Sequence, residues 1–218
     1  MILGVEIKET CDAVFIRRLN RFLAEIEVKS KIILAHVPNS ARLLELLESN
    51  TELLVTKNEG LKSKTEYKIY AVRKNDNLIS IDSIFPNIIF KECISSNLLP
   101  EFAGWKIKKN EYLINDSKID FLLYKKKDEK VTGACSSPTD YYKDQELRLV
   151  ELKSCSMVVD GVALFPDSPT TRCLRHVRTL AESFERGFNP HIIWIIQRND
   201  ANYFSINNKI QPELEKFI

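Results

Sequence analysis

The chain has 218 residues, of which 44% are hydrophobic and 28% are charged, and its formal net charge at pH 7 is +2. This length allows one large or two modest domains with buried cores, and the small net charge excludes a protein that attracts nucleic acid through a strong overall positive field. The apolar stretches are too short to cross a bilayer and the N-terminus lacks a secretory signal, so we expect a cytoplasmic protein with no membrane partner.

The five cysteines are odd in number, widely scattered and never spaced as Cys-x-x-Cys. This pattern argues against a zinc finger and favours reduced thiols in a reducing compartment. A Cys135–Cys155 or Cys155–Cys173 bridge stays open, because sequence alone does not establish proximity.

The first third of the chain has the pattern of a small β-barrel, with short apolar segments between polar turns. We expect these strands at residues 13–16, 22–28, 31–36, 52–55 and 67–72. Between the third and fourth strands, Asn39 or Ser40 would cap a helix with an apolar face of leucines. Five strands and one helix are typical of an OB fold, whose strands commonly bind nucleic acid.

Basic residues in this region are candidates for tracking a nucleic-acid backbone. They are Arg17, Arg18, Arg21 and Arg42. Phe15 or Phe22 is available to stack on bases, although core packing is the stronger expectation for both.

From about residue 84 the pattern changes to helices alternating with strands. The expected elements are helix 84–96, strands 105–114, 118–125 and 147–153, a strand partner near 157–164, a helix beginning near Pro169, a central strand at 191–197 and a short helix at 212–217. Residues 126–145 are rich in charge, glycine and serine and predict a long loop. The order α-β-β-β-α-β predicts a mixed sheet flanked by helices, so we expect two domains, 1–83 and 84–218.

The helix near Pro169 should begin at an Asp167 or Ser168 cap. Its predicted core stripe consists of apolar residues at helical spacing, namely Leu174, Val177, Ala181, Phe184 and Phe188. The other side of the helix would carry Arg172, Arg175, His176, Thr179 and Arg186, and His176 would be either packed or solvent-facing.

Three charged residues inside apolar strands are the strongest sign of chemistry. Asp120 lies in the run 118–123, while Glu151 and Lys153 lie in 149–154. Residues two apart on a strand share a face, and buried charge is costly unless it is paired or binds a metal. If neighbouring strands bring the three together, they suit a hard divalent cation and an attacking water. The alternative is a structural ion pair, since Glu-x-Lys also occurs at Glu6, Glu27 and Glu66.

Five segments spread over nearly the full chain resemble the SfsA family, the sugar fermentation stimulation proteins. These segments are Arg17–Phe22, His36–Ser40, Ser117–Leu123, Val150–Ser154 and the stretch from Phe165 to His176. The resemblance implies an N-terminal OB fold and a C-terminal domain of the PD-(D/E)XK nuclease superfamily, in a DNA-binding protein linked to the regulation of sugar utilisation. The chain departs from the family pattern at Ala41, Ser168, Pro169, Cys173 and the 126–145 segment, which looks like an insertion.

The resemblance also implies roles for single residues. Asp120 and Glu151 would be the catalytic acids and Lys153 the superfamily's lysine, while Glu111 aligns with a further acid on the preceding strand. Under this hypothesis Mg²⁺ or Mn²⁺ is held by Asp120 and Glu151, joined by the Leu152 carbonyl, and Lys153 orients the attacking hydroxide.

Partners follow from the same hypothesis. DNA, single- or double-stranded, is the expected partner, and RNA stays open. Arg172 and Arg175 would neutralise phosphates along the helix, or simply form a solvated face. The rival function is a non-catalytic DNA-binding regulator of sugar metabolism with a vestigial site. The sequence leaves the oligomeric state open.

Overall fold

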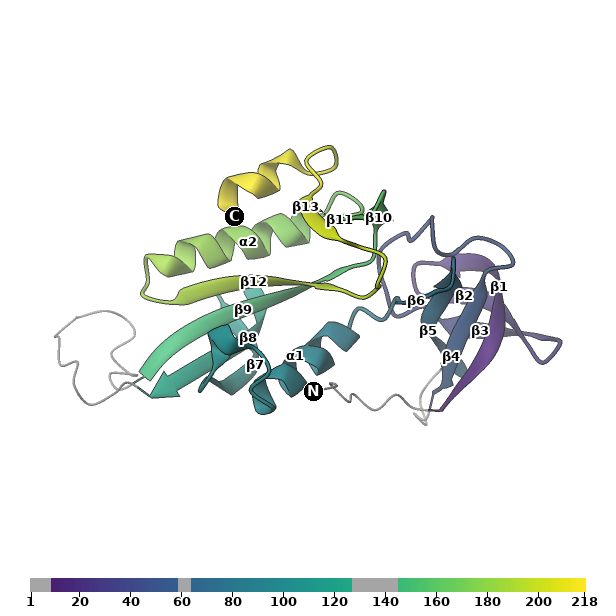
Figure 1. Cartoon of the computed structure of the whole chain (residues 1–218), viewed down its shortest axis with the longest axis horizontal. Coiled ribbons are helices and arrows are strands. Elements are labelled where there is room, and N and C mark those ends of the chain that lie inside the picture. Colours follow the sequence, from purple (N-terminus) through teal and green to yellow (C-terminus); the bar gives the residue numbers. More distant parts are fainter. Residues whose placement is uncertain (1–8, 59–63, 127–144) are drawn as a thin grey trace.

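The computed structural model describes residues 9–58, 64–126 and 145–218. This part of the chain forms an N-terminal β-barrel and a C-terminal domain in which helices cover a mixed sheet (Figure 1). Residues 127–144, which make up nearly all of the expected loop and include Cys135, lie outside the described residues. No helix of the described residues is long and apolar enough to span a membrane.

The barrel consists of six strands, one more than the sequence predicts. They are β1 (Thr10–Asn20), β2 (Leu23–Val28), β3 (Lys31–His36), β4 (Glu52–Lys57), β5 (Tyr67–Lys74) and β6 (Asn77–Ser80). The strands are hydrogen-bonded in the order β3-β2-β1-β4-β5-β6, and parallel pairing of β3 with β5 closes the barrel. The expected OB-type architecture is therefore confirmed.

Two-residue turns fix the register of two barrel hairpins. Lys29 and Ser30 join β2 to β3 with φ of 49° and 62°, and Asn75 and Asp76 join β5 to β6 with φ of 50° and 61°. Type I′ turns require positive φ at both central residues and match the right-handed twist of the strands. With this register, alternate residues of β2, such as Ile26, point into the barrel core.

The prediction of a helix after Asn39 is wrong. The segment forms a turn instead, in which Leu43 has φ of 52° and its carbonyl accepts the N–H groups of Leu46 and Leu47. The Asn39 side chain accepts the Ala41 N–H at 2.8 Å and donates to the Ile81 carbonyl at 3.0 Å. Such side-chain bonds compete with a helical backbone, and the turn lets Leu43 and Leu46 plug the barrel core.

The C-terminal domain is built on a four-stranded sheet in the order β12-β9-β8-β7. Its strands are β7 (Lys106–Ile114), β8 (Ser117–Lys126), β9 (Gln145–Cys155) and β12 (Asn189–Ile196). Because β9 runs antiparallel to β8 and parallel to β12, the sheet is mixed, as expected. Helices α1 (Phe85–Ser95) and α2 (Thr171–Phe184) cover opposite faces (Figure 1).

Two strand assignments within this domain are wrong. The segment expected to pair with β9 forms β10 (Val158–Val159) and β11 (Val162–Phe165), which join β13 (Tyr203–Ile206) in a separate small sheet. The strand expected to be central, β12, stands at an end of the four-strand order. Short 3₁₀ helices at Pro100–Phe102 and Pro212–Phe217 complete the described elements, the second at the place where a helix was expected.

Helix α2 is rotated from the orientation that its apolar residues predict. His176, Thr179 and Ser183 are buried, whereas Phe184 is 69% exposed. Each buried polar side chain has a partner, since His176 contacts Glu151, Thr179 contacts Ser117 and Ser183 donates to the Leu180 carbonyl. A buried polar group with a partner avoids most of its desolvation cost.

The N-cap of α2 also differs from the prediction. It is Thr170, whose Oγ1 accepts the Cys173 N–H at 3.2 Å, in place of Asp167 or Ser168.

The barrel and the sheet domain meet at Asp82 and Gln197. Lys68 Nζ lies 2.7 Å from Asp82 Oδ2, and Gln197 Nε2 donates to the Asp82 carbonyl at 3.4 Å. Gln197 also accepts the Ser80 N–H and donates to Ser154 Oγ at 2.7 Å. These bonds tie the end of the barrel to the ends of β9 and β12.

Asn39→Ala should lower the free energy of unfolding by about 1–3 kcal/mol, because it leaves the buried partners of the amide unsatisfied. Urea denaturation measures the change. Ser40→Ala, at the exposed neighbouring position, is the control and should stay within about 0.5 kcal/mol. Equal effects of the two substitutions would contradict the assigned role of the Asn39 side chain.

Candidate active site

The site begins where strands β8 and β9 stop pairing. Their antiparallel register runs from Lys126↔Gln145 to Phe121↔Val150 and ends there. The Leu152 N–H, two residues further along β9, donates instead to Asp120 Oδ2 at 2.8 Å. Asp120 is thus held against β9 by its side chain. The N–H and C=O of one strand residue point to the same edge, so the Leu152 carbonyl also faces this opening.

Glu151 and Lys153 project from β9 on the side covered by α2. Lys153 Nζ and His176 Nδ1 both contact Oε1 of Glu151, the latter at 2.6 Å. The side chains of Glu151 and His176 are 4% and 3% exposed. The structure therefore brings Asp120, Glu151 and Lys153 together, the arrangement that the metal-site hypothesis requires. It also adds His176, which the sequence left as either packed or solvent-facing.

The two carboxyl groups have pKa values displaced in opposite directions. Burial, and then the negative charge of Glu151, raises the pKa of Asp120 above its ordinary value, although the Leu152 N–H, Lys153 and Asn87 act against the shift. Burial would also raise the pKa of Glu151, but the His176 hydrogen bond and the charge of Lys153 outweigh it and lower that pKa. Two acids of one site whose pKa values are displaced in opposite directions commonly have different chemical roles.

One oxygen of this cluster lacks a partner. Glu151 Oε2 is buried and has no hydrogen bond among the described residues. A buried carboxylate oxygen without a donor is costly, and a cation or a bound water removes that cost. Within the described part of the chain no group of three or more His, Cys, Asp or Glu side chains is arranged to hold a metal. Mg²⁺ and Mn²⁺ take carboxylate oxygens and keep several waters, so an ion held by Asp120 and Glu151 would need water to complete its coordination.

Helix α1 supplies a residue that the sequence did not single out. Asn87 Nδ2 donates to Asp120 Oδ1 at 3.4 Å. Its only sequence signal is its place in the first turn of the helix that precedes the acidic strand. Glu111, the further acid implied by the resemblance, is exposed on β7 and its closest ion-pair partner is Lys118 at 3.8 Å. The structure does not bring Glu111 into the Asp120–Glu151 cluster.

The four candidate arginines of the barrel have different surroundings. The Arg18 guanidinium donates to the backbone carbonyls of Arg21, Asn39, Ala41 and Arg42 at 2.6–2.8 Å, so it holds the barrel loops together. Arg17 pairs with Glu25 at 2.7 Å across the strands. Arg21 and Arg42 are exposed.

The two phenylalanines proposed for base stacking differ in their exposure to solvent. Phe15 is 2% exposed and belongs to the barrel core. Phe22 is 50% exposed and stacks beside His36, with ring centroids 6.3 Å apart. Only Phe22 can offer a free ring face to a ligand.

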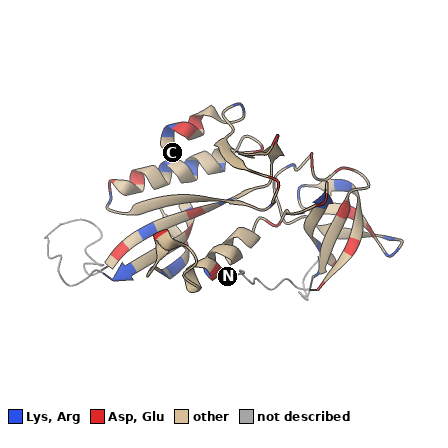
Figure 2. Ribbon diagram, viewed as in Figure 1, with Lys and Arg blue, Asp and Glu red and all other residues tan. Residues whose placement is uncertain are grey.

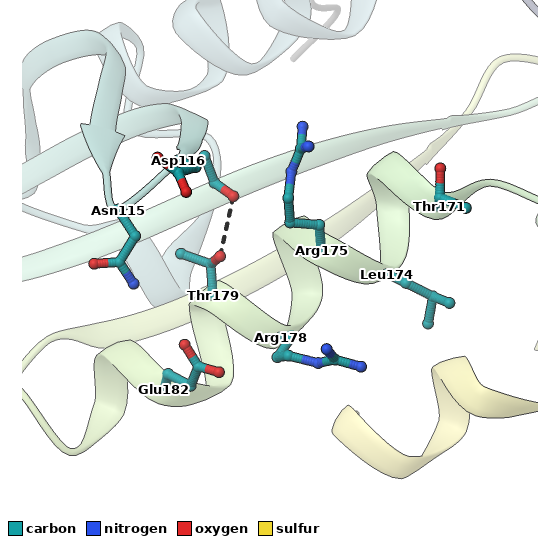
Figure 3. A pocket seen from close by; sticks show the side chains of 9 residues that line it. Asn115, Asp116, Thr171, Leu174, Arg175, Arg178, Thr179 and Glu182 are labelled. Atoms are coloured by element: carbon teal, nitrogen blue, oxygen red, sulfur yellow. Dashed lines mark hydrogen bonds between the residues drawn. The ribbon is translucent and has the colours of Figure 1, made fainter.

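On the C-terminal domain, Arg172 and Arg175 are exposed on α2. Arg175 lines a cavity of about 390 Å³ between α2 and the turn that joins β7 to β8. Figure 3 shows Arg175 and Arg178 leaving α2 in different directions, while Asn115 and Asp116 lie on the β7–β8 turn across from Thr179. Acidic residues share the region, and charges of both signs lie along α2 and the barrel (Figure 2). Any binding of a polyanion must therefore use local contacts.

Fold and site together define a two-domain protein, an OB-type barrel followed by a helix-covered mixed sheet that carries the buried Glu151 and the partly buried Asp120. Two family models match it: the SfsA N-terminal OB domain over residues 16–81 and the Sugar fermentation stimulation protein RE domain over residues 84–218. The chain belongs to the sugar fermentation stimulation protein family.

Several relatives carry the same name. The chain is 34% identical to the sugar fermentation stimulation protein homolog of Caldanaerobacter subterraneus subsp. tengcongensis, over 94% of this chain and 81% of the relative. It is 30% identical to the homolog of Methanothermobacter thermautotrophicus, over 98% and 81%. The solved structure of Pyrococcus furiosus SfsA in complex with Ca²⁺ is similar with a TM-score of 0.83 and 27% identity, over 98% of this chain and 85% of that one.

Asp120→Asn should make the protein more stable at neutral pH. Because the folded-state pKa of Asp120 is raised, the protonated form stabilises the fold at low pH and this contribution is lost as pH rises through that pKa. Asparagine stays neutral and keeps an oxygen for the Leu152 N–H. Urea denaturation at pH 7 should therefore show a gain that shrinks near pH 3, below the ordinary Asp pKa of about 3.9.

The control is Asp116→Asn, at an exposed position on the same hairpin, which should change stability by less than about 0.5 kcal/mol. A loss of stability in Asp120→Asn at pH 7 would show that the ionised form is the favoured one.

Proposed function

We propose that this protein is a divalent-metal-dependent nuclease that cleaves phosphodiester bonds in DNA. The observation that carries the proposal is that Asp120, Glu151 and Lys153 lie close enough to interact through their charges, and that Oε2 of the buried Glu151 carboxylate has no hydrogen-bond partner among the described residues. Calcium bound to the Pyrococcus furiosus relative supports a cation site in this fold. The resemblance to PD-(D/E)XK nucleases supplies the reaction class.

Asp120 and Glu151 are the residues that would hold Mg²⁺ or Mn²⁺, with the Leu152 carbonyl as a third oxygen. A metal bound there would lower the pKa of a water molecule and polarise a phosphoryl oxygen. The chain's own contribution is to fix the two acids, because the Leu152 N–H and Asn87 hold Asp120 while His176 holds Glu151.

Lys153 is the residue that would act on the reacting phosphate. Its side chain is 14% exposed, which leaves it partly accessible from the opening beside Asp120. An ammonium group at this place neutralises charge that develops on the phosphate, or orients the attacking hydroxide. Lysine is suited to this because it acts as a compact positive charge on a flexible stem.

Arginines on both domains are the proposed DNA contacts. Arg172 and Arg175 lie exposed on α2, the helix that also carries His176. A phosphate bound by these arginines would therefore contact the helix that contributes His176 to the site. Arg21, Arg42 and the exposed Phe22 offer the barrel a charged and aromatic surface, which is how OB folds hold single strands. RNA is the alternative polymer. DNA as substrate and free thiols at Cys155 and Cys173 agree with a cytoplasmic location.

A second function, non-catalytic DNA binding in the regulation of sugar metabolism, is favoured by one observation. Lys153 contacts Glu151 directly, and such a pair is also kept for structural reasons, because the loss of one partner would leave an uncompensated buried charge. Under this reading the acidic pair is a vestige of a nuclease site.

Asp120→Ala and Glu151→Ala should each reduce cleavage of labelled DNA by about 10³-fold, since a metal contributes several kcal/mol to the transition state. Lys153→Ala should reduce cleavage while metal binding persists. Purified protein is incubated with single- and double-stranded DNA and RNA in Mg²⁺, Mn²⁺ or chelator. Glu146→Ala, exposed on the same strand as Glu151, is the matched control.

Cleavage that persists in both acidic variants would reject the site assignment. DNA binding with no metal-dependent cleavage in the unmodified protein would instead support the regulatory function.

Arg172→Ala and Arg175→Ala should weaken DNA binding, and each should reduce the slope of log affinity against log salt by about 1. Fluorescence anisotropy over a salt series measures both. Arg73→Ala is the control, because Arg73 is exposed on the barrel and lies 3.6 Å from Asp12. An unchanged slope in both α2 variants would remove this helix from the DNA interface.

A further inference from the structure

We propose that His176 is a positioning residue, which holds the Glu151 carboxylate so that Oε2 faces the cation site and Oε1 does not. The inference rests on the proposed metal site, and it assigns to that site a residue from the covering helix. Three observations carry it: the atoms in contact, the burial of both side chains, and the orientation of helix α2.

The contact fixes one oxygen of Glu151. His176 Nδ1 lies 2.6 Å from Oε1. An ionised carboxylate only accepts hydrogen bonds, so Nδ1 must carry the proton and donate it. With Oε1 engaged by His176 and Lys153, the oxygen left without a partner is Oε2.

Burial makes this hydrogen bond persistent. The two side chains are 3% and 4% exposed, so water does not compete for either. Lys153 contacts the same oxygen but is more exposed and sits on a flexible stem. If Lys153 turns towards a phosphate, His176 is the donor that stays on Glu151.

The orientation of α2 is explained by this contact. The helix buries His176 while leaving Phe184 exposed, which is the reverse of what the apolar pattern favours. One turn further along, Thr179 Oγ1 lies 3.0 Å from Ser117 Oγ on β8, the strand of Asp120. Helix α2 is therefore bonded to both acid-bearing strands, and His176 is its link to β9.

The test measures Ca²⁺ binding to the full chain by titration calorimetry. In His176→Asn the amide nitrogen takes the approximate place of Nδ1 and preserves a donor, whereas His176→Leu fills the site without one. Ser183→Ala removes another buried hydrogen bond of α2 that does not touch Glu151, so it controls for general loosening of the helix.

We expect His176→Leu to weaken Ca²⁺ affinity by about 10- to 100-fold, the usual cost of losing a partner of a metal ligand. His176→Asn should recover most of the affinity and Ser183→Ala should retain it. Wild-type affinity in His176→Leu, or equal loss in the folded Asn and Leu variants, overturns the positioning role alone. If the unmodified protein binds no Ca²⁺, Mg²⁺ or Mn²⁺, the proposed metal site fails and this inference fails with it.

A second measurement uses the unmodified protein without metal, so it does not depend on whether a variant folds. Nitrogen-15 NMR of histidine-labelled, metal-free protein should show a proton on Nδ1 of His176 that exchanges slowly with water, because the tautomer is set by the Glu151 bond. A His176 ring protonated only at Nε2 would mean that it does not donate to Glu151, and the inference would be overturned.

Discussion

The buried carboxylate of Glu151 is the constraint on which the C-terminal domain depends. A charge at this depth is tolerated only with partners, and the chain supplies them from the same strand and from the covering helix. Meeting this requirement turns α2 away from its apolar pattern and leaves a phenylalanine in solvent. Functional sites characteristically have less favourable apolar packing around a polar cluster.

Much of the fold follows from the sequence because periodicity and turn chemistry agree. Five of the six barrel strands and the two sheet strands that carry the acids lie where the apolar segments of the sequence place them. The pairing of β8 with β9, which brings Asp120 near Glu151, was a condition of the metal-site hypothesis, because the sequence alone does not specify which strands are neighbours. The three candidate residues could therefore be named from the sequence, whereas their convergence could not.

Two of the errors share a physical cause, which is side-chain hydrogen bonding that no periodicity encodes. The Asn39 side chain accepts the Ala41 N–H and donates to the Ile81 carbonyl in place of a helix, and His176 is buried against a carboxylate distant in sequence. Asn87 was missed because one amide in a helix carries no pattern. The edge position of β12 was hidden because an apolar run predicts burial without specifying neighbours.

The bonds of Gln197 hold the barrel and the sheet domain in one arrangement. The Gln197 side chain donates to the Asp82 carbonyl, at the end of the barrel, and to Ser154 Oγ, which follows Lys153 in β9. The Gln197 backbone carbonyl accepts the Ser80 N–H. These bonds fix the spacing between the barrel and the strand that carries Glu151 and Lys153. Under the proposed function, a nucleic acid that contacted both domains would therefore meet two surfaces held at one constant interval.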